Sequence, residues 1–536
     1  MFLLVGDGGS RVSDPCLEVS DYVLEELAHI VGGSATGTIS ASVAGDVNAV
    51  FGIELTEREI ATADSLVALG ALVQTALTRR FAAGKADGEP RPDPSADEDL
   101  PLSGAQRRIW FMQQFSPSST VYNVPTRLEL TGPLVVEALH AALTDLLARH
   151  EILRTYYPAR SGVPSVAVRP AGPADVSRVD ASTEAEVDRL AEEQARIPFR
   201  LERDLSVRFV LVRRAPDRHI LIGTFQHIAV DGLTLDLLGR ELGALYSRHA
   251  GSGAAPTPPP ARQYAEFARA DAAAATSEAR RRAVAERAAQ LSGLPFPLVL
   301  PTDFPRPRFP RFQGDAVAVA LDESLTAGVR GLARQQRVTP FAVLLAALAV
   351  VLRRAAGRPD VVVGTPAAGR LLPKWHDVAG CFINMVPVAV TVPDGSTGAG
   401  VIAGAAEAAW RALERQDVPF EDLMRTITRR NVQPLTVMLS YQVSGPPVRF
   451  AGLADTTLTV SRPAGTAKYD LSLYAVATGP ALRLELEYDT DLYAAETATA
   501  ILGAFRAQLK AFVADPAAVV DLHGPSGFDK PECVEF

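Results

Sequence analysis

Residues 219–246, with the sequence HILIGTFQHIAVDGLTLDLLGRELGALY, decide how the larger part of this chain folds. Residues 219–225 are mostly apolar and predict a short buried strand. Residues 233–246 carry leucines at helical spacing and predict an amphipathic helix. The loop QHIAVDG at 226–232 joins the two segments, so the stretch predicts a strand–loop–helix unit.

The loop contains residue types that are suited to proton transfer. His227 leaves the predicted strand toward a possible cleft, and a histidine titrates near neutral pH. Asp231 can orient the ring or hold the loop, and Gly232 permits close backbone approach. A plainer structure fits equally well, in which His227 is a partly buried strand-end residue and Asp231 is the helix N-cap. The pattern HxxxDG alone does not separate the two interpretations.

Strand-like and helix-like segments alternate on both sides of this stretch. A predicted amphipathic helix at 136–147 precedes a predicted strand at 153–157. In the second half, Thr339 and Pro340 predict the start of a helix over 341–352, which is followed by a strand at 361–363. This alternation predicts an α/β fold. Two halves of similar length, about 100–260 and 261–523, predict paired lobes.

Proline and charge divide the chain into units. Residues 82–101 combine four prolines with mixed charge and predict an exposed linker after a small unit at 1–81. We assign an N-terminal lobe to 102–262 and a C-terminal lobe to 263–523. The tail at 524–536 has too little apolar content to pack, and we expect it to be frayed.

Composition and missing motifs exclude several functions. The chain has 536 residues and a formal net charge of −9, which disfavours a nucleic-acid or anionic-membrane surface. Cys16, Cys381 and Cys533 form no CxxC pair, so we expect neither a metal site nor a disulfide framework. The apolar runs are too short for a signal peptide or a membrane span. We expect a cytoplasmic protein, and no GxSxG elbow, P-loop or HExxH motif is present.

Short motifs follow one another along the large unit. They are LSGAQRRIWF at 102–111, RHEILRT at 149–155, QHIAVDG at 226–232, LPTDFPRP at 300–307, GTPAAGR at 364–370 with GCFIN at 380–384, and QDVPFEDL at 416–423. In this order they resemble the signatures of nonribosomal peptide synthetase condensation domains, which have a chloramphenicol-acetyltransferase-like fold. The resemblance covers about residues 99–523.

The resemblance implies two lobes in a V with a central tunnel. A donor thioester on one carrier protein and an acceptor amine enter from opposite sides, and the amine attacks the thioester carbonyl to form an amide. His227 matches the catalytic histidine, which acts as a base or as a hydrogen-bonding positioner. Asp231 and Gly232 match the end of the motif, and Arg370 is our candidate partner for Asp231. Asn384 is assigned a supporting role.

Two positions depart from the family pattern. Gln226 stands where the family has its first histidine, and Leu233 stands where a tryptophan is usual. The first position mostly faces away from the reacting groups in the family. We therefore expect activity to survive, with Gln226 supporting the loop.

The unit at 1–81 resembles a degenerate or truncated peptidyl carrier domain, which would be small and helical. GGSATGT at 32–38 resembles the carrier motif, so Ser34 is the candidate attachment site for 4′-phosphopantetheine. The residue between Gly-Gly and Ser is missing, and little chain precedes the motif. Ser65 is a weaker alternative, because no room remains after it for the later carrier helices. A remnant without the cofactor, or a helical appendage, also fits.

These features predict an acyltransferase that acts on thioesters. The chain shows no adenylation or thioesterase unit, so carrier proteins of other synthetase subunits would deliver substrates on phosphopantetheine. An ester-forming enzyme or one that uses a free amine is an alternative within the same fold. A non-catalytic platform that recruits carriers or tailoring enzymes is the alternative from another class. Gln226 and the altered carrier motif favour the platform, whereas His227, Asp231 and Arg370 favour the enzyme.

Overall fold

A computed structural model describes most of the chain from residue 100 onward. The described residues are 100–528 except 161, 254–257, 308–309, 428–434, 446 and 462–464, together with 44, 47–48, 54–63, 68–69, 72–73 and 76. The chain forms two compact units, residues 1–93 with 159–164 and residues 94–158 with 165–536. The first contains α3 (Glu57–Ile60), which Thr56 caps, and the hairpin β3 (Ala159–Arg160) with β4 (Val163–Pro164). Ser34 and Ser65 lie outside the described residues.

The N-terminal lobe of the second unit is built on a sheet in the order β13-β1-β8-β7-β6. Its strands are β1 (Asn123–Thr131), β6 (Val176–Asp180), β7 (Val207–Ala215), β8 (Arg218–Gln226) and β13 (Thr459–Val460). Its helices are α6 (Val136–Arg149), α7 (Glu184–Ala195) and α8 (Gly232–His249). β8 lies between β1 and β7 and pairs antiparallel with both along nearly its whole length. The strand and the helices predicted at 219–225, 136–147 and 233–246 are therefore confirmed.

The C-terminal lobe is built on a sheet in the order β11-β10-β12-β14-β15-β9. Its strands are β9 (Gly314–Ala320), β10 (Asp360–Ala367), β11 (Asn384–Thr391), β12 (Val437–Val443), β14 (Leu471–Thr478) and β15 (Ala481–Asp489). Its helices are α11 (Glu323–Gln335), α12 (Pro340–Ala356), α13 (Gly398–Leu413) and α15 (Ala495–Ala514). α12 packs between α11, α13 and α15.

The apolar helix predicted at 341–352 is the centre of the C-terminal core. Every residue of α12 from Ala342 to Leu352 is buried, because its sequence is apolar on all sides. Thr339 caps its start, Pro340 occupies the first turn, and Gly357 ends it in the left-handed conformation with φ 65°. Among the described residues, no single helix is long and apolar enough to cross a bilayer; α11 and α12, bent by 104°, meet that criterion only as a pair.

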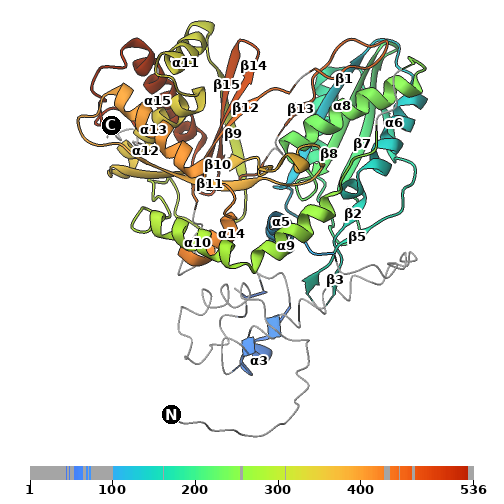
Figure 1. Cartoon of the computed structure of the whole chain (residues 1–536), viewed down its shortest axis with the longest axis horizontal. Helices are drawn as coiled ribbons and strands as arrows, with labels where there is room; N and C mark the ends of the chain where they lie inside the picture. Colours follow the sequence, from blue (N-terminus) through green and yellow to red (C-terminus); the bar gives the residue numbers. More distant parts are fainter. Residues whose placement is uncertain are drawn as a thin grey trace, which may run out of the picture. The chain divides into compact units, whose positions relative to one another are not determined.

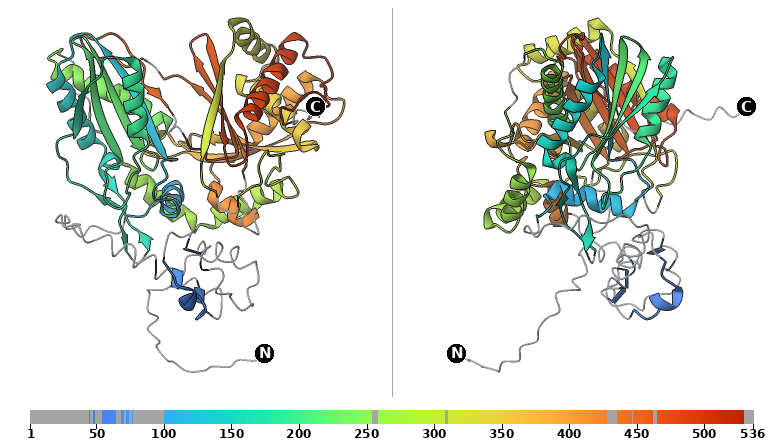
Figure 2. Two further views of the ribbon diagram at one scale, coloured as in Figure 1. Left: turned by 180° about the vertical axis from the view of Figure 1, so that it is seen from behind. Right: turned by 90° about the vertical axis from the view of Figure 1, so that its right-hand side faces the viewer.

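The remaining elements of this unit lie outside the two large sheets. They are α5 (Gly104–Phe115), the short helix η2 (Glu151–Arg154), β2 (Thr155–Tyr156) with β5 (Ala167–Val168), α9 (Tyr264–Ala275), α10 (Glu278–Leu291), the short helix η3 (Pro373–Trp375) and α14 (Phe420–Ile427). Figures 1 and 2 show α5, α9, α10 and α14 below the two sheets, which diverge above them. We call this group of four helices the base.

The chain also crosses between the lobes above the base. After β12 it leaves the C-terminal sheet and adds β13 to the edge of the N-terminal sheet, where Val460 pairs with Thr126. It then returns to β14 in the C-terminal sheet. The two lobes are therefore not independent in sequence, because the second half completes the sheet of the first.

Two predictions of local structure are wrong. The tail does pack as far as it is described, because Phe528 is buried in the C-terminal core beside Tyr493, with ring centroids 6.1 Å apart. Gly527, with φ 80°, brings the backbone so close to Ile501 that a Cβ atom would not fit. The strand predicted at 153–157 begins two residues later, because η2 forms first. The lobe boundary at 262/263 stays a prediction.

Candidate functional site

The loop between β8 and α8 is held at both ends by backbone and cap hydrogen bonds. The amide of His227 donates to the carbonyl oxygen of Tyr122 at 2.8 Å, which fixes the loop to the residue before β1. Asp231 is the N-cap of α8, and its Oδ1 accepts from the amide of Thr234 at 2.9 Å. The plainer expectation for Asp231, a helix cap, is therefore met, and the next contacts show that it does more.

The histidine ring is held in one orientation. Nδ1 of His227 lies 2.8 Å from the carbonyl oxygen of Val230. A carbonyl oxygen only accepts, so Nδ1 carries the hydrogen and Nε2 keeps its lone pair in the neutral ring. Within the part of the chain that the structure describes, no group forms a hydrogen bond with Nε2. The ring therefore presents an unused acceptor.

The surroundings of His227 favour its neutral form. Burial lowers the pKa of the imidazole to about 4, the Lys468 ammonium adds to this shift, and the Asp231 carboxylate opposes it. His227 as a residue is partly exposed to solvent. At neutral pH the ring is a hydrogen-bond acceptor rather than a cation.

Asp231 and Arg370 form a buried ion pair between the lobes. Nη1 of Arg370 lies 2.5 Å from Oδ2 of Asp231, and each side chain is 3% exposed. Arg370 also donates to Oγ1 of Thr234 at 2.7 Å and to the carbonyl of Val378 at 3.1 Å. Its guanidinium lies 4.1 Å from the ring centroid of Phe382. The structure thus brings together the pair predicted from the motifs, and it fixes the loop from the opposite lobe.

The segment before β11 lies against the same loop. Thr234 Oγ1 donates to the carbonyl of Gly380 at 2.7 Å, and the Cys381 Sγ lies 3.9 Å from Nδ1 of His227. Burial raises the pKa of Cys381 to about 12, so the group stays a thiol. A Cβ atom on Gly380 would lie 1.8 Å from the Tyr264 ring, so this close approach requires glycine.

The other predicted residues have different places. Gln226 is fully buried, and its Oε1 accepts a hydrogen bond from the Ile228 amide at 2.9 Å. It therefore stabilises the backbone of the loop. Asn384 supports α14 instead of the histidine, because its Oδ1 accepts from the Phe420 amide at 3.0 Å. The close approach expected at Gly232 is wrong, because a Cβ atom there would have no heavy atom within 4 Å. Gly232 is simply the first residue of α8.

The motif analysis missed a second ion pair that joins the lobes. Nη1 of Arg108 on α5 lies 2.7 Å from Oε1 of Glu421 on α14. Burial opposes the charge of Arg108, but Glu421, Tyr122 and Tyr469 outweigh it and raise the pKa of the guanidinium. Arg108 and Glu421 both lie in quoted motifs, but only the fold shows that the two motifs meet.

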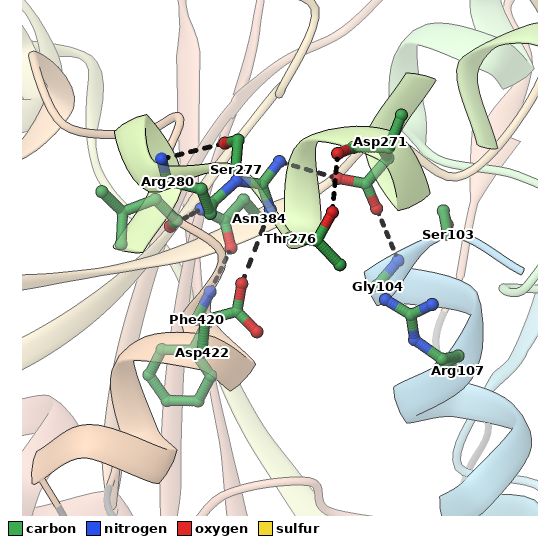
Figure 3. A network of polar contacts seen from close by, with 12 residues as sticks. Ser103, Gly104, Arg107, Asp271, Thr276, Ser277, Arg280, Asn384, Phe420 and Asp422 are labelled. Carbon is green, nitrogen blue, oxygen red and sulfur yellow. Dashed lines mark hydrogen bonds and ion pairs between the residues drawn. The ribbon is translucent and has the colours of Figure 1, made fainter. Parts of the chain in front are cut away.

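A chain of polar contacts continues this junction through the base (Figure 3). The Gly104 amide at the start of α5 donates to Oδ2 of Asp271 on α9 at 2.8 Å. Oδ1 of Asp271 accepts from Arg280 on α10 at 3.0 Å, and Arg280 lies 3.5 Å from Asp422 on α14. α5 is thus connected to the other three helices of the base.

Comparison with known proteins identifies the family and the fold. The sequence model described as "Condensation domain" matches residues 96–523, which is most of the chain. The chain belongs to the condensation-domain family. Members of this family in nonribosomal peptide synthetases are acyltransferases that form peptide bonds and work with carrier domains.

Curated relatives of this condensation domain are large synthetases. It is 33% identical over 445 residues to chondramide synthase cmdD of Chondromyces crocatus, a match that covers 81% of this chain and 11% of the synthase. It is 32% identical over 440 residues to phosphinothricin tripeptide synthetase PhsC of Streptomyces viridochromogenes, covering 76% of this chain and 39% of the synthetase. The chain thus spans a minor part of either relative.

Solved condensation-type structures share the fold of this domain. The X-domain from teicoplanin biosynthesis is 25% identical, with a TM-score of 0.70, covering 81% of this chain and 98% of that one. The first condensation domain of the calcium-dependent antibiotic synthetase has a TM-score of 0.70 at 23% identity, covering 80% of this chain and 99% of that one. The second likeness supports the fold alone.

Proposed function

We propose that this condensation domain joins a carrier-bound acyl or peptidyl thioester to an amine with the help of His227. The observation that carries the proposal is the hydrogen bond from Nδ1 to the Val230 carbonyl, which leaves Nε2 as an acceptor. The Asp231–Arg370 pair supports it, because it holds the loop that carries the ring.

In the proposed reaction, His227 orients the amine and carries its proton to the leaving group. Nε2 accepts a hydrogen bond from the amine, whose lone pair attacks the thioester carbonyl carbon. The new C–N bond forms, the amine proton moves to Nε2, the C–S bond breaks, and the proton passes to the leaving thiolate. A pKa of about 4 lies below the range that suits a strong general base near neutral pH. It favours orientation of the amine over a long-lived imidazolium.

The substrates would arrive on phosphopantetheine arms of carrier proteins. We propose that partner synthetase subunits supply at least one carrier, and that the unit at 1–81 supplies the donor if Ser34 is modified. Intact mass after treatment with coenzyme A and a phosphopantetheinyl transferase tests this, with Ser34→Ala and Ser65→Ala as comparisons. An adduct that disappears only in Ser34→Ala supports the carrier, and no adduct on folded protein contradicts it.

The test of catalysis uses the full chain with small thioesters. Aminoacyl N-acetylcysteamine thioesters serve as donors and acceptors, and dipeptide products are measured by mass spectrometry. We expect His227→Ala to form at least about a hundredfold less dipeptide than wild type, because alanine cannot accept a hydrogen bond from the amine. His249→Ala is the control, since His249 lies in an exposed pair with Asp145. Equal product from wild type and His227→Ala would contradict the proposal.

The same assay separates the alternatives. A hydroxyl acceptor in place of the amine tests for an ester-forming enzyme. An acceptor amine that is not itself a thioester, supplied with the same thioester donor, tests for an enzyme that uses a free amine. A recruitment platform is favoured by Gln226 and by the likeness to an X-domain, 26% identical, that was solved in complex with OxyB. Folded wild type that gives no product with any donor or acceptor would favour the platform.

A further inference from the structure

A lysine of the C-terminal lobe lies against the residue that holds the catalytic loop. Lys468 precedes β14, and its Nζ lies 4.8 Å from the ring centroid of Tyr122. Tyr122 precedes β1 in the N-terminal lobe, and its carbonyl oxygen accepts the His227 amide at 2.8 Å. A cation over an aromatic face is attracted to it. The contact therefore links one lobe to the backbone of the histidine on the other.

We propose that Lys468 is a positioning residue for His227: from the opposite lobe it holds Tyr122, and with it the histidine backbone, and it places a positive charge near the imidazole. The inference rests on the proposed role of His227. It adds a residue outside the loop motif to the machinery of the site. It also makes the state of the histidine depend on contact between the lobes.

The charges around His227 support this role. Lys468 disfavours a positive charge on the imidazole ring, Asp231 favours one, and the neighbouring Cys381 is a neutral thiol. Asp231 is engaged by Arg370 from the C-terminal lobe. Besides burial, two charged groups thus act on the ring in opposite directions: Lys468 of the C-terminal lobe acts against protonation, and Asp231 of the N-terminal lobe favours it.

The consequence is a specific pH dependence. Without the ammonium, the imidazole protonates more easily, so its pKa is higher than in wild type. Nε2 is then lost as an acceptor at a higher pH than in wild type. The effect grows as the pH falls from 7 to 5 and vanishes above pH 7, where the ring is neutral in both proteins. A purely structural role would weaken activity equally at every pH.

The experiment compares Lys468→Met and Lys468→Arg with Lys510→Met, a control at an exposed lysine of α15. The ratio of kcat/KM for each variant to that of wild type is measured from pH 5 to 8, which cancels the titration of the substrate amine. We expect the Lys468→Met ratio at pH 5 to fall to about half of its value at pH 8. We expect the ratios for Lys468→Arg and Lys510→Met to be independent of pH.

A direct titration makes the result independent of turnover. The ring signals of ¹⁵N-labelled histidines are followed by NMR, with His227 assigned by its loss in His227→Gln. A higher pKa for His227 in Lys468→Met, and not in Lys510→Met, supports the proposal. An unchanged pKa, or a loss of activity that is equal at all pH values, overturns it. If His227→Ala retains activity, the proposed function fails, yet the titration still decides whether Lys468 acts on the ring.

Discussion

The ion pairs in two regions of this domain, the loop that carries His227 and the base, differ in burial. At the loop that carries His227, Arg370 and Asp231 are each 3% exposed. In the base, Arg280 is 16% exposed, and its partners Asp271 and Asp422 are 12% and 24% exposed. Water and salt reach the base contacts more readily, so these are weaker and easier to rearrange. A buried pair is costly to break, because the remaining charge has no water to solvate it.

The difference shows where this domain needs a fixed geometry. In the proposed reaction, the loop that carries His227 presents Nε2 to an amine, and a small misplacement of the ring is costly in rate. The base only has to hold two lobes near each other. The buried ion pair therefore lies beside His227, and the ion pairs that solvent reaches more readily lie in the base.

The largest effect is expected from Asp231→Asn. Asparagine still caps α8, but it leaves the buried Arg370 without its counter-charge. We expect the free energy of unfolding to fall by about 3–5 kcal/mol, measured by urea denaturation. The double variant Asp231→Asn with Arg370→Met should recover part of the loss, because no buried charge is left unpaired. Equal stability of Asp231→Asn and wild type would remove the distinction between the two regions.

A smaller effect is expected from pH, through His227. Its pKa in the folded protein is about 4, below the ordinary 6.5, so the unfolded chain binds the proton more readily. The free energy of unfolding is therefore unaffected by protonation of His227 above pH 6.5. It decreases as the pH falls toward 4, by up to about 2–3 kcal/mol. The slope of stability against pH over this range should be shallower in His227→Gln. Identical slopes in the two proteins would contradict the lowered pKa.

The base should respond less, and in a way that depends on salt. We expect Arg280→Met to cost about 1 kcal/mol of unfolding free energy, and less at high salt. Arg282→Met is the matched control on the same helix, since Arg282 is 69% exposed in a pair with Glu278. A cost at Arg280 that is as large as that of Asp231→Asn and insensitive to salt would show that the base is as rigid as the loop.

The smallest effect is expected from Gln226→His. The Gln226 side chain is fully buried and contacts the loop backbone through the Ile228 amide, and a histidine nitrogen can accept the same hydrogen bond. We expect product formation within about threefold of wild type. Complete loss of turnover would show that Gln226 has a specific role in this chain.

The strand–loop–helix unit was predictable because its signals are local. Apolar residues in β8, leucine spacing in α8 and the cap at Asp231 lie within a few residues of one another. The partnership of Asp231 with Arg370, 139 residues away, came from the order of motifs in the family and not from the physics of either segment. The contact of Lys468 with the Tyr122 ring could not be predicted from the sequence, because the two residues belong to different lobes and meet only in the folded protein.

Sequence reasoning failed where a single side chain decides the outcome. The tail has a low average hydrophobicity, yet Phe528 packs in the core beside Tyr493 and anchors its first part. Gly232 was expected to permit a close backbone approach, but its surroundings are open, whereas Gly380 is enclosed by the Tyr264 ring. An average over a segment cannot report a close contact between residues that are distant in sequence.

The strand β13 has a consequence for how this domain is made on the ribosome. Thr126 pairs with Val460, which is synthesised much later. The edge of the N-terminal sheet therefore stays unpaired while the whole intervening chain is synthesised. An unpaired sheet edge is prone to pair with other chains, and pairing between distant residues is slow. Translation that stops before β13 should therefore yield an N-terminal half that aggregates, and the domain becomes safe from misassembly only when nearly all of it has emerged.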